Sequence, residues 1–170
     1  MIGELTTMKK VVFSLTVLFV LFAFAACSSE SVQDTVSAEL GIDVSGGEEL
    51  SVSDTHGGFH GDGVSSIALS FSNSNVLDKI KGNATWEPFP LDETVQALVY
   101  GVKDETGSIG PFINDGNGNP LVPEIQNGYY ILIDRQEDQE RNILDRPSFN
   151  VTVGLYNTDT NTLYCCTLDT

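Results

Sequence analysis

The sequence predicts an α+β fold, in which an antiparallel sheet of about five strands is packed by two or three helices mainly on one face. Two patterns support this prediction. The strand-like segments follow one another through turn residues, and the helix-like segments come as one consecutive pair. A parallel, doubly wound sheet requires strands and helices to alternate regularly, and this chain has no such alternation.

The first segments of the predicted domain form a helix and a hairpin. Residues 32–40 predict a short helix that ends at Gly41. Residues 50–53 and 66–72 each alternate between apolar and polar types, which is typical of strands with one buried and one exposed face. A glycine-rich loop at residues 55–63 separates these two strands, so we expect them to pair.

Two further helices are expected in the middle of the chain. Residues 73–81 place Val76 and Ile80 four positions apart, on one helical face. Residues 92–100 begin with an aspartate that can cap a helix. An aromatic, proline-containing connector at residues 86–90 joins the two helices.

The last third of the chain predicts one loop and three strands. Glycine and proline recur through residues 104–127 and predict a long surface loop. Residues 129–133 form a continuous apolar run, as expected of a strand buried on both faces. Residues 149–155 alternate, and residues 162–168 are expected to pair back on them across a turn.

Length and charge limit the possible functions. The chain has 170 residues, with 8 Lys+Arg against 24 Asp+Glu and a formal charge of −16. This length suits one domain with a sizeable core. Phosphate binding needs clustered basic residues, so a nucleic-acid partner is disfavoured. Electrostatic docking on anionic lipid is disfavoured for the same reason.

The first residues have the order of a secretory signal. Lys9 and Lys10 precede an uncharged run at residues 11–26, which is shorter than the ~20 residues that span a bilayer. The segment Phe24-Ala25-Ala26-Cys27 resembles a bacterial lipobox, with phenylalanine in the position where leucine is usual. A plain secreted protein and an uncleaved N-terminal anchor are the alternatives.

The lipobox resemblance implies a lipoprotein on the extracytoplasmic face of the cell membrane. Residues 1–26 would be the signal peptide, and residues 27–48 would hold the lipidated Cys27 and a tether with a possible short helix. Residues 49–170 would be a single α+β domain. Acyl chains on Cys27 would hold the protein stably at the membrane. Cleavage would remove one acidic and two basic residues and leave 6 basic and 23 acidic residues.

Both histidines of the chain lie in the glycine-rich loop. His56 and His60 stand four apart, and Asp54 and Asp62 lie two residues outside them. Imidazoles and carboxylates are the usual ligands of zinc, manganese and iron, and an acidic chain attracts cations. The four residues are therefore a candidate site for a divalent metal. A hairpin loop built from turn-forming residues, or an acid–base pair of one histidine with one aspartate, would explain the same pattern.

Two shorter motifs lie in the predicted strands. Asp134 and Arg135 follow the apolar strand and could line a ligand cleft or form a surface salt bridge. Cys165 and Cys166 are neighbours in a strand and should point to opposite faces, so they are not expected to form a disulfide with each other. We expect one of these thiols to be buried and the other to be partly exposed.

The glycine-rich block at residues 54–63 also carries a resemblance. Together with Asp134-Arg135, residues 148–150 and residues 156–164, it is similar to a group of small exported proteins of Gram-positive bacteria. The resemblance covers about residues 50–170 and implies an exported single domain. It supplies no catalytic residues.

The sequence therefore favours a non-enzymatic binding or protective module of the cell envelope, anchored by lipid, with a protein or a cationic ligand as its partner. The alternative is a metal-binding or metal-dependent envelope protein that uses Asp54, His56, His60 and Asp62.

Overall fold

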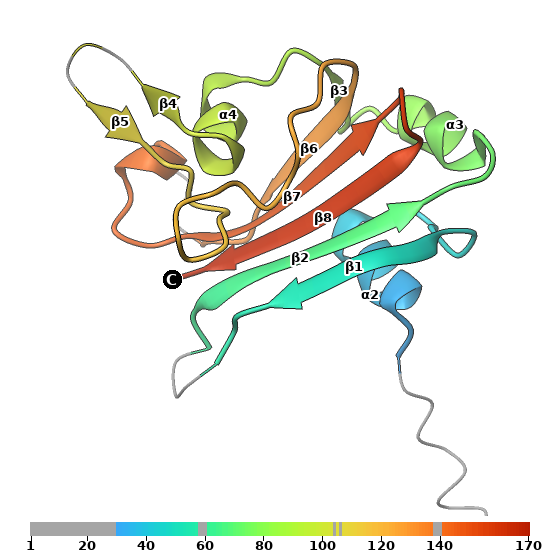
Figure 1. The fold of residues 1–170 in the computed structure, drawn as a ribbon, viewed down its shortest axis with the longest axis horizontal. Coiled ribbons are helices and arrows are strands. Elements are labelled where there is room, and N and C mark those ends of the chain that lie inside the picture. The colour runs from blue at the N-terminus through green and yellow to red at the C-terminus, as the bar shows by residue number, and fades with distance from the viewer. Residues whose placement is uncertain (1–29, 58–60, 104, 106, 138–140) are drawn as a thin grey trace, which may run out of the picture. The chain divides into compact units, whose positions relative to one another are not determined.

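Six antiparallel strands form the main sheet of the computed structural model, in the order β1-β2-β8-β7-β6-β3 (Figure 1). The structure describes residues 30–57, 61–103, 105, 107–137 and 141–170. Contacts group Val32–Thr170 into one unit, which holds all the elements given below. The expected signal peptide and Cys27 lie outside the described residues.

The strands of the main sheet are β1 (Glu48–Asp54), β2 (Gly63–Ser70), β3 (Glu87–Pro88), β6 (Gly128–Asp134), β7 (Asn150–Asn157) and β8 (Thr162–Asp169). A small second sheet pairs β4 (Val102–Lys103) with β5 (Ser108–Ile109). The helices of the described residues are α2 (Val32–Leu40), α3 (Asn75–Gly82) and α4 (Glu93–Val99), with a 3-10 turn at Ile143–Asp145. None of the helices in these ranges is long and apolar enough to cross a membrane.

The α+β prediction is confirmed, because every predicted helix and strand forms close to its expected place. The hairpin of β1 and β2 also forms as expected. The sequence did not predict β3, β4 or β5, since two residues are too few to show an alternating pattern.

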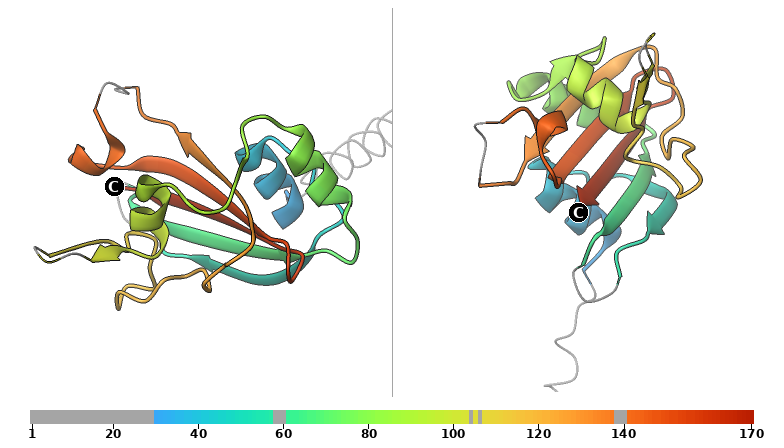
Figure 2. Two further views of the ribbon diagram at one scale, coloured as in Figure 1. Left: turned by 90° about the horizontal axis from the view of Figure 1, so that it is seen from above. Right: turned by 90° about the vertical axis from the view of Figure 1, so that its left-hand side faces the viewer.

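The two central strands are buried on both faces. Residues 151–156 of β7 are all buried, and the neighbouring β8 is buried along most of its length. Two separate apolar clusters form, one on each face of the sheet. Helices lie against both faces, as the two views in Figure 2 show. Successive residues of a strand point to opposite faces, so β7 contributes Leu155 to one cluster and Tyr156 to the other.

The first face of the sheet is covered by α2, α3 and Trp86. Leu40 of α2 and Trp86 lie so close over β7 that the sheet needs a glycine beneath them. A Cβ atom added at Gly154 would lie 2.8 Å from Ile131 Cγ2 and 2.9 Å from both Leu40 Cδ2 and Trp86 Cη2. Trp86 is therefore a core residue at the point where helix and sheet come closest.

The second face is covered by α4 and by the long segment that follows it. Asp92 Oδ1 accepts the N–H of Val95 at 2.8 Å and so caps α4, as the sequence predicted. Ile113, Val122 and Ile125 of the long segment are buried against the sheet. Most of the described residues of this segment are exposed, as predicted, but the sequence did not show that these three apolar residues pack against the sheet.

The adjacent cysteines of β8 are both buried. Cys165 is 2 % exposed in the first cluster and Cys166 is 0 % exposed in the second, and both are free thiols. The expectation that one thiol is partly exposed was wrong, because β8 lies in the middle of a sheet that is covered on both sides. Burial raises the pKa of the Cys165 thiol above its ordinary value and raises the pKa of Cys166 to about 11.

In the chain from Ser28 onwards, both buried thiols of Cys165 and Cys166 should resist a thiol reagent at pH 8 and react once the protein is unfolded.

The same burial predicts how stability depends on pH. Each of the two thiols keeps its proton to higher pH in the folded chain than in the unfolded chain. Its contribution to stability is therefore complete below the unfolded pKa of about 9 and is lost as the pH rises towards 11. Unfolding midpoints at pH 8 and pH 10.5, beside a Cys165→Ala/Cys166→Ala variant with a flatter profile, would test this. Rapid labelling of the folded protein would contradict it.

Candidate functional site

The side chain of Arg135, which follows β6, joins three elements on the first face of the sheet. Its Nη1 donates to Glu39 Oε2 of α2 and to Thr152 Oγ1 of β7, each at 2.7 Å. Its Nε donates to Asn150 Oδ1 at 2.6 Å, and its Nη2 lies 3.2 Å from Asp169 Oδ1 at the end of β8. The planar guanidinium suits this task because it donates in several fixed directions at once.

His56 extends this group to the end of β1. Its Nε2 lies 3.1 Å from Asp169 Oδ2 and its Nδ1 lies 2.7 Å from Asp54 Oδ1. The backbone N–H of His56 donates to the same Asp54 oxygen at 2.9 Å. The hydrogen bond from the backbone, followed by that from the ring, holds the pKa of Asp54 below its ordinary value. We call the connected set the Arg135 network: Glu39, Asp54, His56, Arg135, Thr152 and Asp169.

Strand pairing explains why residues so far apart in the sequence meet. Asp54 of β1 lies opposite Ser65 of β2, and Asp169 of β8 lies opposite Gly63 at the start of β2. His56 crosses the end of β2 between the two aspartates. A Cβ atom at Gly63 would lie 2.5 Å from the Cα of His56, so only glycine lets the chain after β1 pass this closely.

The chemistry of the network favours positioning over reaction. The side chains of Arg135, Glu39 and Asp169 are 29 %, 31 % and 32 % exposed, so water only partly screens their charges. Each nitrogen of His56 faces a carboxylate, and both can donate when the ring carries two protons. In this arrangement both ring nitrogens of His56 lie in hydrogen-bonding contact with carboxylates.

The structure describes three of the four residues proposed as metal ligands. Asp54 and His56 are in contact, Asp62 is exposed, and His60 lies outside the described residues. Within the described ranges, no group of three His, Cys, Asp or Glu side chains is placed to hold a metal ion.

Asp134 and Arg135 point to opposite faces of the sheet, as neighbours at a strand end do. Asp134 Oδ2 accepts from Arg146 Nη1 at 2.7 Å on the second face, where the two side chains are 17 % and 4 % exposed. Arg146 also donates to the backbone carbonyl of Arg141. The two residues therefore line no common cleft. Each one fastens a different loop or helix to the sheet.

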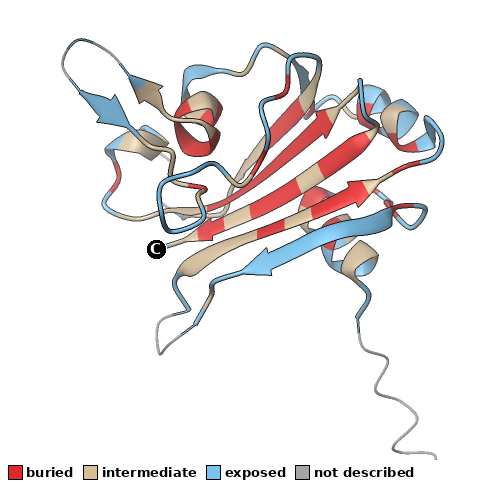
Figure 3. Cartoon of the chain, viewed as in Figure 1, coloured by how far each residue is buried: buried red, intermediate tan, exposed pale blue. Residues whose placement is uncertain are grey.

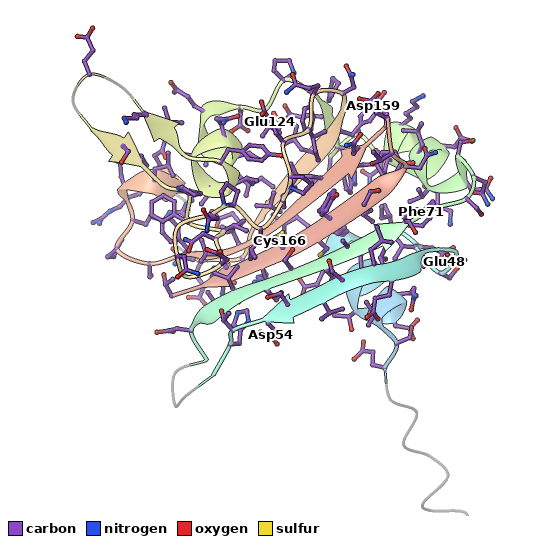
Figure 4. All side chains as sticks on the ribbon, viewed as in Figure 1. Glu48, Asp54, Phe71, Glu124, Asp159 and Cys166 are labelled. Atoms are coloured by element: carbon purple, nitrogen blue, oxygen red, sulfur yellow. The ribbon has the colours of Figure 1, made fainter. Side chains whose placement is uncertain are left out.

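The strand β1 forms the open edge of the sheet beside the network. All seven of its residues are exposed (Figure 3), and Leu50 and Val52 are 58 % and 49 % exposed. The register shifts between Glu49 and Ser51, so Leu50 is a bulged residue without a partner on β2. Acidic residues stand at both ends of the strand, as Figure 4 shows for Glu48 and Asp54.

The pairing of β1 with β2 determines which backbone groups face the open edge. Thr55 N donates to Val64 O at 2.9 Å, so Thr55 faces β2. Hydrogen-bonded and non-hydrogen-bonded pairs alternate along an antiparallel ladder, so Ser53 also faces β2. Val52 and Asp54 therefore direct their backbone N–H and C=O groups outwards.

No family model, curated protein or solved structure matches this chain. Sequence reasoning found Asp54, His56 and Arg135 but missed Glu39, Thr152 and Asp169, which complete the network. These three residues come from a helix and two strands, and no local pattern sets them apart from ordinary surface residues. Of these three residues, only Asp169 would have been found by a search for charged residues at strand ends, and that search would also return Glu48 and Asp134.

Replacing Arg135 with methionine should lower the free energy of unfolding by about 2 kcal/mol, because Glu39 and Asp169 would lose the cation that they share. Arg135→Lys should cost less, since it keeps the charge but not the several fixed donors. Lys79→Gln breaks the exposed pair of Lys79 with Asp43 and should cause no measurable change. Denaturant unfolding measures all three. Equal effects for Arg135→Met and Lys79→Gln would contradict the role given to the network.

Proposed function

We propose that the protein is a lipid-anchored, extracytoplasmic module that binds a cationic segment of a partner protein along β1. The partner would add a strand to the sheet, with backbone hydrogen bonds for affinity and side-chain contacts for specificity. The observation that carries this proposal is the complete exposure of β1, because proteins usually cover or shorten an edge strand of this kind. The Arg135 network supports it by holding the end of β1 in place before a partner arrives.

Charge favours a cationic partner over a second copy of this chain. Antiparallel pairing of two copies of β1 about Ser51 would set Glu48 opposite Asp54 of the other copy, and like charges in opposite positions destabilise a sheet. Glu48, Glu49 and Asp54 would instead attract lysine or arginine side chains on a partner strand. Val52 and Leu50 would give that strand apolar contact between the charges.

The short connection to Cys27 supports the anchored part of the proposal. Only four residues, Ser28 to Ser31, separate Cys27 from the unit that begins at Val32. At ~3.5 Å per extended residue, such a tether would keep the binding module close to the lipid surface. A partner reached in this way would itself be at the cell envelope.

Replacing Cys27 with serine should abolish the lipid anchor, because serine has no thiol to form the thioether. In a bacterial host, the wild-type chain should incorporate labelled palmitate and sediment with membranes, and the Cys27→Ser chain should do neither. Equal membrane association of both chains would contradict lipid anchoring and point to an uncleaved apolar segment.

A synthetic peptide of alternating lysine and valine should bind to the chain from Ser28 onwards, which includes the whole Val32–Thr170 unit. It should shift the amide signals of Val52 and Asp54 in an NMR titration and bind more weakly as salt increases. The Val52→Pro variant should keep its unfolding midpoint, since proline is tolerated where the N–H faces solvent, but bind about tenfold more weakly. Ser53→Pro should lower the unfolding midpoint, because it removes an N–H that faces β2.

Three outcomes would contradict binding along β1 and leave the proposal of a lipid anchor unaffected. A control peptide of alternating glutamate and valine could bind as well as the lysine–valine peptide. The signal changes could fall on another face, or sedimentation could show that β1 pairs with a second copy.

A further inference from the structure

A cleft of about 440 Å³ opens where α3, β3 and the start of β6 meet, at the opposite end of β6 from Arg135. A volume of this size lies within the range of roughly 300–1,000 Å³ that small-molecule sites occupy. One part of the lining is apolar and aromatic, from Leu77, Phe89 and Tyr129. The other part is polar, from Lys81, Gln126 and Asn127. The cleft is separate from β1 and does not depend on the function proposed for that edge.

Lys81 is the cation of this cleft, and it has no carboxylate partner in the described part of the chain. Lys79, Arg135 and Arg146 each contact at least one carboxylate at 4 Å or less. Lys103 and Arg141 also lack a carboxylate partner among the described residues, so what distinguishes Lys81 is its place in the lining of the cleft. Lys81 lies in the last turn of α3, where a cation is favoured by the helix dipole, but that interaction needs no cleft. The ammonium group is therefore free to meet an anion.

The amide side chains of Gln126 and Asn127 donate through their nitrogens to nearby carboxylates, which leaves their carbonyl oxygens available to a ligand. Gln126 Nε2 donates to Glu124 Oε1 at 2.9 Å, and Asn127 Nδ2 donates to Asp159 Oδ2 at 3.0 Å. Each amide group is thereby fixed through its nitrogen. The side-chain carbonyl oxygens of Gln126 and Asn127 accept no hydrogen bond from the described residues, so they can accept from the hydroxyl groups of a ligand.

We propose that this cleft binds a small carboxylated sugar. The carboxylate pairs with the ammonium of Lys81, and the hydroxyl groups donate to Gln126 and Asn127. The apolar C–H face of the sugar ring packs on Phe89 and Tyr129, whose rings offer a flat apolar surface. The cation, the amide acceptors and the aromatic rings of the cleft thus each contact one part of a carboxylated sugar. A plain inorganic anion would leave the aromatic surface and the amide acceptors without contacts.

The test is an NMR titration of the chain from Ser28 with D-glucuronate, in parallel with D-glucose and inorganic phosphate. Glucuronate should shift the amide signals of Asn127, Gly128 and Tyr129, whereas glucose and phosphate should each bind about tenfold more weakly, since each makes only some of the contacts. Lys81→Gln should weaken glucuronate binding about tenfold. Lys79→Gln, two residues earlier on the same helix, is the matched control and should leave binding unchanged.

A second variant separates a sugar site from a simple anion site. Gln126→Leu removes one acceptor from an exposed position and should weaken glucuronate binding without affecting phosphate. The proposal is overturned if glucuronate causes no shifts at the cleft at tens of millimolar. It is also overturned if phosphate binds as well as glucuronate, or if Lys81→Gln behaves like Lys79→Gln.

Discussion

The burial of β7 and β8 on both faces is the constraint on which the rest of the structure depends. A strand with apolar side chains on both sides needs a cover on each side, because one exposed face would leave a large apolar surface in water. The chain meets this need with α2, α3 and Trp86 on one face and with α4 and residues 110–127 on the other. The irregular segment after α4 thus contributes Ile113, Val122 and Ile125 to the core beside the helices.

The helices and the long segment that cover the central strands leave the edge strand β1 exposed. The strands β1, β2 and β8 are neighbours in the sheet, yet all seven residues of β1 are exposed and most of β8 is buried. The contacts at the Asp54 end of β1 are therefore polar, since Arg135 and Asp169 link α2, β7 and β8 to His56 and Asp54. An open edge that is fixed in this way is ready to receive another strand without losing much conformational freedom on binding.

The two proposed binding surfaces differ in their electrostatics because they use different residues of the same acidic chain. The edge at β1 is acidic and suits a cation, whereas the cleft at α3 contains Lys81 and suits an anion. They lie at different strands of the sheet, so one can be changed without the other. If Cys27 anchors the protein as we propose, both surfaces would face the same cell envelope, with a partner protein on the edge and a small anion in the cleft.

The sequence by itself determined the α+β class, the three helices and the five longer strands, because apolar periodicity and capping residues act within a few positions. It also singled out His56, Asp54 and Arg135 through their residue types. Only the tertiary structure decided that these three share one network through Asp169, that Asp134 turns to the other face, and that both cysteines are buried. Those outcomes depend on strand order and register, which bring residues more than 100 positions apart into contact. Pairing between distant strands leaves no local signal in a single sequence, so the site could be predicted only in part.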